Sequence, residues 1–216
     1  NDMEIKIRNE LKKGNIYYTM DGSDPDESSL FYNKPFKIDA TVGIKARTFW
    51  DNGESSGVNE KTFTKVNTIP GVEKSFSKGI KYEFFDKNSF EKSSGGSQGF
   101  RKLPDFSLLD PTSIGVSSKL DLKVRESDDY FALRFFGFVH VPTNGIYTFY
   151  ADSDDGSKIF IHDKLVVDND YTHGMTEVSG QIALKKGKHP IKVLFFQGEG
   201  GKGLEVSYSG PDTPKT

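Results

Sequence analysis

Short segments in which apolar and polar positions alternate make up most of the chain, and this pattern predicts β-strands. In Ile44–Phe49, for example, apolar side chains alternate with lysine and arginine, so one face of the segment is expected to be buried and the other wet. Gly, Asn, Asp and Pro bound these segments, and long amphipathic helical patterns are absent. The sequence therefore predicts an all-β protein.

Two series of expected strands are separated by the polar stretch Lys65–Gly71, which contains Pro70-Gly71. We place a module boundary there, giving residues 1–66 and 67–216. The short strands of the first module are typical of a small immunoglobulin-like β-sandwich. They are Met3–Arg8, Ile16–Met20, Lys34–Ile38, Val42–Phe49 and Val58–Lys65. Those of the second module, an antiparallel series, are Gly79–Phe85, Leu120–Val124, Tyr130–Val141, Gly145–Ala151, Lys158–His162, Leu165–Val167, Thr176–Leu184, His189–Gln197 and Gly203–Ser209.

Turn-forming residues separate the strands of the second module. Asp163-Lys164 and Lys185–Lys188 lie where hairpin turns are expected, and Ser93–Gly99 is expected to be a flexible loop.

Composition excludes several classes of function. Lys and Arg number 29 and Asp and Glu 31, a formal net charge of −2, so no electrostatic feature indicates a nucleic-acid partner. No apolar run approaches the ~18 residues of a membrane span. The chain has no cysteine, which excludes disulfides, thiol catalysis and cysteine-held zinc. Because the first residue is Asn1 and no leader follows, we interpret the chain as a piece of a longer protein.

The first module contains the run Ile16-Tyr17-Tyr18-Thr19-Met20-Asp21-Gly22-Ser23-Asp24-Pro25, followed by Pro35-Phe36 and Ile44–Arg47. Its Y-T-x-D-G-S-x-P core resembles the C-terminal immunoglobulin-like module of chitobiases and β-hexosaminidases. The resemblance covers about residues 1–65. It implies attachment to the catalytic domain of a glycoside hydrolase, usually a β-N-acetylhexosaminidase.

Residues from about Val72 to Asp212 resemble the PA-14 family, named after a domain of the anthrax toxin protective antigen. The family's fold is a β-sandwich, and its members occur in glycosidases, toxins and yeast adhesins, so the resemblance alone does not decide function. The residues that carry it are Gly145–Phe149, Ser153–Ser157, Ile159–Ile161, Leu165–Asn169, His173-Gly174, Gly187–Ile191, Gly203–Glu205 and Ser209–Pro211.

The acidic run Asp152–Gly156 is the best candidate for a metal site, because calcium prefers several oxygen ligands at short range. In the sugar-binding adhesin branch of the PA-14 family, a cis-linked aspartate pair holds calcium, and the ion binds sugar hydroxyls. Asp154 and Asp155 are the matching residues. Where the adhesins add an Asn, this chain has Gln197, and Lys202 nearby would repel a cation. The alternative is a hairpin turn without metal.

Strand connections gather at the two ends of a sandwich, so further residues of the neighbouring loops are candidate carbohydrate ligands. His173 follows a polar loop and is expected to order that loop or to line a pocket, while Tyr171 is an aromatic residue of the same loop that could stack on a sugar. None of the four histidines has the spacing of a zinc site. The full candidate set is Asp154, Asp155, Asp168, Asn169, Tyr171, His173, Gln197, Glu199 and Lys202.

No nucleophile motif is present, and the chain is too short for the ~250-residue barrel of a hexosaminidase. The leading hypothesis is therefore a non-catalytic accessory region, a spacer plus a carbohydrate-binding module, of a bacterial glycoside hydrolase that is secreted, periplasmic or at the cell surface. One alternative is a calcium-dependent carbohydrate-binding or adhesin module. Another is a structural protein–protein interaction module that binds no sugar.

Overall fold

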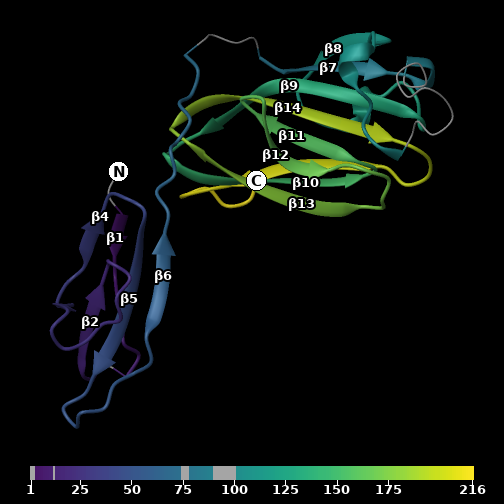
Figure 1. Ribbon diagram of the computed structural model, residues 1–216. Coiled ribbons are helices and arrows are strands. Elements are labelled where there is room, and N and C mark those ends of the chain that lie inside the picture. Colours follow the sequence, from purple (N-terminus) through teal and green to yellow (C-terminus); the bar gives the residue numbers. More distant parts are fainter. Residues whose placement is uncertain (1–2, 12, 74–77, 90–100) are drawn as a thin grey trace. The chain divides into compact units, whose positions relative to one another are not determined.

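The computed structural model describes residues 3–11, 13–73, 78–89 and 101–216. The chain divides into two compact units, Asn1–Asn67 and Thr68–Thr216, whose named elements are β-strands and two 3-10 turns (Figure 1). The prediction of an all-β protein, with a small β-sandwich followed by a larger antiparallel one, is confirmed. The predicted loop Ser93–Gly99 lies outside the described residues.

The smaller unit contains two antiparallel sheets. Ile5 and Ile44 are buried, and the rings of Tyr18 and Phe36 stack with centroids 4.7 Å apart. The strand Leu30–Phe31 was not predicted, and the first strand ends at Ile5 rather than Arg8. One sheet pairs β1 (Met3–Ile5) with β4 (Phe36–Ile38); the other has the order β3 (Leu30–Phe31), β2 (Asn15–Thr19), β5 (Val42–Phe49), β6 (Asn59–Phe63).

Hydrogen bonds within one turn explain the motif that follows β2. The Thr19 hydroxyl donates to the Ser23 carbonyl over 2.5 Å. Asp21 Oδ1 accepts from the Ser23 amide at 3.0 Å and from the Ser23 hydroxyl at 2.6 Å, the usual chemistry of an Asp turn. The side chain of Asp24 pairs with Lys45 of β5 at 2.7 Å. These residues therefore stabilise a local turn.

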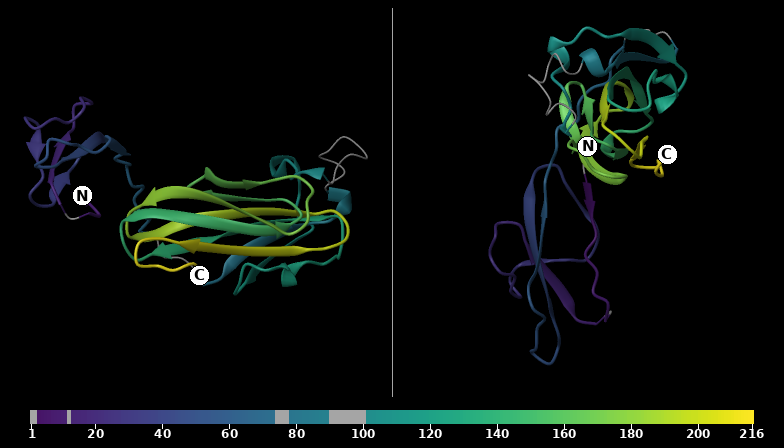
Figure 2. Two further views of the ribbon diagram at one scale, coloured as in Figure 1. Left: turned by 90° about the horizontal axis from the view of Figure 1, so that it is seen from below. Right: turned by 90° about the vertical axis from the view of Figure 1, so that its right-hand side faces the viewer.

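The larger unit consists of a six-stranded and a three-stranded antiparallel sheet (Figure 1 and Figure 2). The six-stranded sheet has the order β12 (Lys164–Asn169), β11 (Ser157–Ile161), β14 (Gly187–Gln197), β9 (Phe131–Val141), β7 (Ile80–Phe85), β8 (Ser113–Ser117); the three-stranded sheet has the order β13 (Thr176–Leu184), β10 (Gly145–Asp154), β15 (Gly203–Ser209).

Alternation along the strands builds the hydrophobic core of this unit. In β10, Tyr147, Phe149 and Ala151 are buried, whereas Thr148 and Tyr150 between them are only partly buried. A second cluster covers part of the six-stranded sheet with the 3-10 turn η2 (Phe106–Leu108). The main core contains Phe84, Phe131, Leu133, Phe135, Val141, Tyr147, Phe149, Ala151, Ile159, Ile161, Val167, Leu184, Val193, Phe195 and Leu204.

Two strand predictions in the larger unit differ from the structure. Leu122–Val124 forms the 3-10 turn η3 instead of a strand, because the Asp121 side chain caps it by accepting from the Lys123 amide at 3.0 Å. Leu122 and Val124 still pack against the core, so burial of every second side chain produces the same apolar–polar alternation here as in a strand. The strand Ser113–Ser117 was missed, since its apolar residues Ile114 and Val116 are exposed at the sheet edge.

The two predicted hairpins have different outcomes. The first hairpin exists, but its turn lies one residue earlier than predicted: His162 and Asp163 form it, with Ile161 opposite Lys164 and positive φ angles of 49° and 60°, as a type I′ turn requires. Lys185–Lys188 does not close a hairpin, because β13 pairs with β10 in one sheet while β14 pairs with β9 and β11 in the other. Both strands have one buried face, so the pattern does not distinguish a hairpin from a crossing between sheets.

A pair of histidines joins the β11–β12 hairpin to β14. His162 Nε2 lies 2.8 Å from Nδ1 of the fully buried His189, whose Nε2 faces the Lys185 carbonyl at 2.8 Å. Because His189 donates to that carbonyl, its Nδ1 accepts from His162. Burial, and then the neighbouring His189, lower the pKa of His162.

We expect this lowered pKa to make the larger unit less stable in mild acid. The unfolded chain binds more protons than the folded one between the lowered and the ordinary histidine pKa, so stability falls as the pH drops from about 7 to about 5. Urea denaturation across this range should show that His162→Asn, which tolerates the positive φ, reduces the pH dependence. The control His140→Gln, at an exposed histidine of β9, should leave the dependence unchanged, and equal slopes in both variants would contradict the assignment.

Candidate functional site

The candidate site lies at one end of the larger unit, where strands of both sheets finish. Asp154 ends β10, and its register partner in β15 is Gly203. Gln197 ends β14, opposite Phe131 at the start of β9. Residues 198–202 connect β14 to β15, so the loop after Gln197 leads directly to the partner of Asp154.

Asp155 is the most enclosed acidic residue of this end, with 2% of its surface exposed. Its Oδ2 accepts from the Gly198 amide at 2.7 Å and its Oδ1 from the His173 amide at 3.2 Å. A cis peptide bond joins it to Asp154. Burial raises the pKa of Asp155; the two amide donors oppose this shift, and the charge of Asp154 adds to it.

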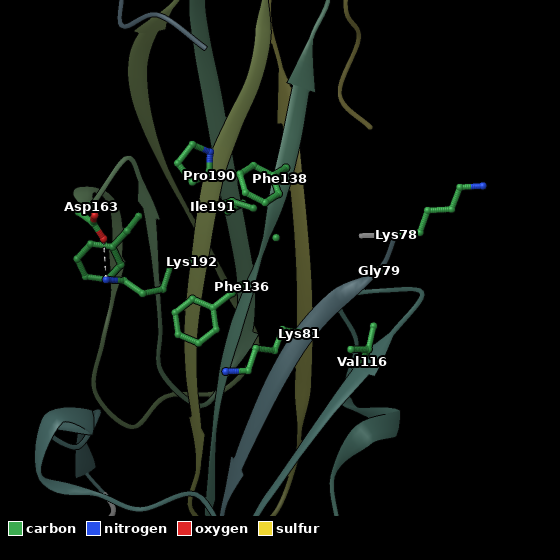
Figure 3. A pocket seen from close by; sticks show the side chains of 12 residues that line it. Lys78, Gly79, Lys81, Val116, Phe136, Phe138, Asp163, Pro190, Ile191 and Lys192 are labelled. Atoms are coloured by element: carbon green, nitrogen blue, oxygen red, sulfur yellow. Dashed lines mark hydrogen bonds and ion pairs between the residues drawn. The ribbon is translucent and has the colours of Figure 1, made fainter. Parts of the chain in front are cut away.

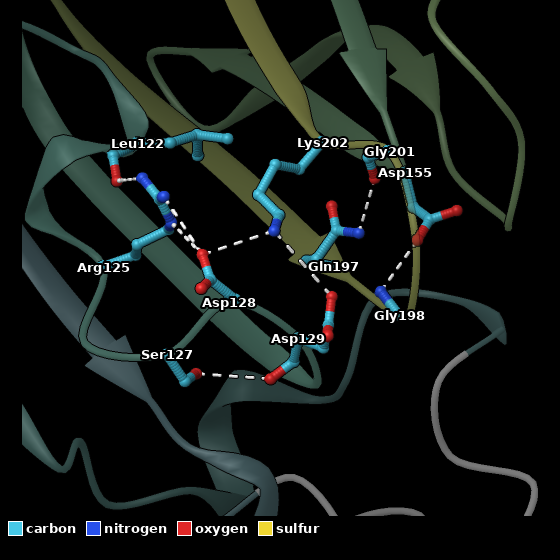
Figure 4. A network of polar contacts seen from close by, with 10 residues as sticks. All are labelled: Leu122, Arg125, Ser127, Asp128, Asp129, Asp155, Gln197, Gly198, Gly201 and Lys202. Carbon is cyan, nitrogen blue, oxygen red and sulfur yellow. Dashed lines mark hydrogen bonds and ion pairs between the residues drawn. The ribbon is translucent and has the colours of Figure 1, made fainter.

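The side chain of Gln197 is fully buried beside Asp155 (Figure 4). Its Nε2 donates to the Gly201 carbonyl at 2.7 Å, which fixes the orientation of the amide. Its Oε1 is also buried but accepts no hydrogen bond from any described residue. An unpaired buried acceptor costs about 1–3 kcal/mol, so this oxygen marks a position where a ligand or cation would be favoured.

Two glycines give the acidic turn its room. A Cβ on Gly201 would lie 2.5 Å from Asp154 Oδ2, so the carboxylate of Asp154 occupies the space that a side chain would fill. A Cβ on Gly156 would lie 2.5 Å from a Phe196 ring carbon and 2.9 Å from the Tyr171 carbonyl oxygen. The absence of these side chains lets the loops after β10, β12 and β14 approach one another.

The side chain of Lys202 is directed toward Asp128 and Asp129 and away from Asp155 (Figure 4). Its Nζ lies 3.3 Å from Asp128 Oδ1 and 3.9 Å from Asp129 Oδ1, and Arg125 Nη2 contacts Asp128 at 3.1 Å. Neither Asp154 nor Asp155 has an ion pair with Lys202. The structure thus differs from the alternative in which Lys202 would neutralise the aspartate pair and close the site.

The other predicted site residues fall into two groups. Asn169 is buried and donates to the Ser153 hydroxyl at 3.1 Å and to the Thr176 carbonyl at 2.8 Å, so it supports the turn from inside. His173 contributes its backbone amide to Asp155, and its ring Nε2 lies 3.1 Å from the Asn169 carbonyl. The remaining three, Asp168, Tyr171 and Glu199, are exposed at the surface. Asp168 Oδ1 lies 3.5 Å from Lys158 Nζ.

Sequence reasoning missed three acidic residues near this end. Asp170 is almost buried and accepts from the Leu103 and Tyr171 amides at 2.8 Å each, while Lys158 pairs with it at 2.9 Å. Asp128 and Asp129 lie just before β9, separated from it by Tyr130, and β9 pairs with β14. Their position in front of this strand was the available signal.

A groove lies on the outer face of the six-stranded sheet and shares no residue with the loop site. This groove, of about 360 Å³, is lined by Phe136, Phe138 and Phe160 together with lysines (Figure 3). Lys192 Nζ lies 4.7 Å from the Phe160 ring centre and pairs with Asp163 at 3.1 Å. The ammonium group of Lys192 in the groove thus already has partners within the protein, whereas the Gln197 oxygen at the loop site has no hydrogen-bond partner.

Clusters of three or more His, Cys, Asp or Glu side chains suited to a metal do not occur among the described residues. A cation at the loop site would therefore depend on two carboxylates supplemented by the Gln197 amide oxygen. Within the described part of the chain, no helix has the length and apolar character needed to cross a membrane.

Comparison with known proteins assigns the family. Residues 79–216 match the PA14 domain and residues 5–63 match the domain described as Fn3 associated. Because the first match covers more than half of the chain, the protein belongs to the PA14 domain family. The resemblance of its second module to this family is confirmed.

Individual relatives are more distant. A 70-residue segment is 34% identical to the anti-sigma-I factor RsgI3 of Acetivibrio thermocellus, covering 32% of this chain and 11% of that protein. Among solved structures, a PA14 sugar-binding domain from an RTX adhesin has a TM-score of 0.51 at 16% identity, covering 64% of this chain and 93% of that one. An anti-sigma factor domain-containing protein has a TM-score of 0.51 at 15% identity, covering 94% and 73%. These structures show the shared fold.

Gly156→Ala should destabilise the larger unit by about 1–3 kcal/mol, because the added methyl meets Phe196 and the Tyr171 backbone. The matched control is Gly174→Ala, since a Cβ at Gly174 meets nothing within 4 Å. Urea denaturation monitored by circular dichroism measures both. Equal stability of the two variants would show that the loops are not packed as described.

Proposed function

We propose that the PA14 domain binds glycans through a calcium ion held by Asp154, Asp155 and Gln197. The observation that carries this proposal is the buried Gln197 Oε1, which has no protein partner beside two adjacent carboxylates. A bound calcium ion would neutralise the carboxylates and offer open coordination positions to vicinal sugar hydroxyls.

The donor set suits a hard cation. Each oxygen of Asp155 accepts one backbone N–H and has a further lone pair, and Asp154 adds a second carboxylate. Burial and the neighbouring charge of Asp154 raise the pKa of Asp155, and a cation between the two carboxylates would oppose both effects. Two carboxylates and one amide provide fewer than the 6–8 oxygens that calcium prefers, so water and sugar hydroxyls would supply the remainder.

The parent protein is a separate question. The chain spans about a tenth of the curated anti-sigma-I factor that it matches, so a role in an anti-sigma factor at the cell surface is a proposal. The β-N-acetylhexosaminidase parent that we inferred from the Ile16–Pro25 motif remains a second candidate. Its support is reduced because the turn hydrogen bonds account for the motif and the relatives named above include no hexosaminidase.

A purified sample of this chain on a glycan array tests the sugar-binding function. We expect signals that require calcium, disappear with a chelator, and are lost in Asp155→Asn. Binding that persists unchanged in chelator would assign recognition to another surface. No signal with or without calcium would favour the structural-module alternative, in which the domain contacts protein only.

Calorimetric titration of calcium into chelator-treated protein tests the ion itself. Asp154→Asn and Asp155→Asn should each abolish measurable binding, because each removes one of two charged ligands. The control is Asp152→Asn, which removes the same charge from a partly buried position of β10, two residues before Asp154. Bound calcium should also raise the unfolding free energy, by about 2.7 kcal/mol at a free concentration of 100 times Kd. Equal affinity in all variants would contradict the ligand assignment.

A further inference from the structure

We infer that Asp128 and Asp129 hold the ammonium group of Lys202 away from the cation site and thereby maintain its affinity for calcium. This inference rests on the proposed function, because it concerns the regulation of the same site. It assigns a positioning role to two aspartates that were not among the predicted ligands.

The position of Lys202 in the chain makes it a potential competitor for the aspartates. It follows Gly201, whose Cα lies against the Asp154 carboxylate and whose carbonyl accepts from Gln197. It also precedes Gly203, the register partner of Asp154. A lysine side chain has several rotatable bonds and a compact charge, so an unrestrained Lys202 would sample positions near the aspartate pair.

The observed contacts draw this side chain in another direction. Asp128 and Asp129 both contact Lys202 Nζ, and both lie in the segment before β9 (Figure 4). Arg125 fixes Asp128 through Nε at 3.3 Å and Nη2 at 3.1 Å, while its Nη1 donates to the Leu122 carbonyl at 3.1 Å. The acceptor for Lys202 is therefore anchored independently of Lys202.

A backbone hydrogen bond maintains the distance between the two segments. The Tyr130 amide donates to the Gly198 carbonyl at 2.9 Å, immediately after the two aspartates. The Gly198 amide in turn donates to Asp155. Gly198 therefore bonds through its carbonyl to the segment that restrains Lys202 and through its amide to the buried Asp155 carboxylate.

The charge of Asp128 also persists in acid. Hydrogen bonds from Arg125 and Lys202 lower the pKa of Asp128, so it stays ionised at a lower pH than an ordinary aspartate. Exposed ion pairs of this kind contribute little to folding stability. Their effect here is to hold the Lys202 ammonium group away from the proposed calcium site. Because the repulsion between this group and a calcium ion falls off with distance, the ion pairs would favour calcium binding.

A double-mutant cycle by calcium calorimetry on the whole chain tests this inference. In the wild-type background, the pair Asp128→Asn and Asp129→Asn should weaken calcium binding about tenfold, equivalent to ~1.4 kcal/mol. In a Lys202→Met background the same pair should change the affinity less than threefold, because no ammonium is left to release. Thermal unfolding in chelator should verify that all four proteins are folded.

Each outcome is informative. An equal loss in both backgrounds would mean that the aspartates attract calcium directly, which overturns the inference while preserving the calcium site. An unchanged affinity in the wild-type background would also overturn it. No calcium binding by the wild-type protein would instead refute the proposed function. If the double variant fails to fold, Arg125→Gln in the same two backgrounds gives a second test, since it loosens Asp128 without removing either carboxylate.

Discussion

The arrangement of the candidate site depends on one buried carboxylate. Asp155 receives one backbone amide from the loop after β12 and another from the loop after β14, and it lies itself in the turn after β10. Three connections that are distant in the sequence therefore converge on one side chain. Backbone donors fix the position of this carboxylate without using other side chains as partners.

A second layer of polar contacts supports this carboxylate from within. The hydroxyls of Ser153 and Ser157 lie 2.8 Å apart, and the Asn169 amide donates to Ser153. All three side chains are buried, so each requires a partner inside the protein, and they supply one another. Buried side-chain hydrogen bonds therefore stabilise the turn from Ser153 to Ser157, whereas the polar side chains of an exposed hairpin could bond to water instead.

Strict alternation made the long strands predictable, whereas the partners of the strands were not. The strand Gly145–Ala151 was recognised because its inward residues are apolar, whereas its continuation to Asp154 was not predicted. The same logic failed at Leu122–Val124, where a 3-10 turn also buries alternate residues, and at Lys185–Lys188, where the chain changes sheets. Asp154, Asp155 and Gln197 could be nominated from a resemblance. The partner of Lys202 could not, because Asp128 is 74 positions away and meets it only through the pairing of β9 with β14.

The direction of β10 separates the loops of the candidate site from the points where the chain joins the PA14 unit. Ile69 bonds to Ala183 and Lys185, and Pro211 packs on Gly145, so both lie near the first residue of β10. Asp154 is its last, and ten residues of extended strand span roughly 30 Å. Ile69 and Pro211 thus lie at one pole of the unit and the loops of the candidate site at the other. A unit with this polarity keeps its connection to the preceding residues away from the loops of the candidate site.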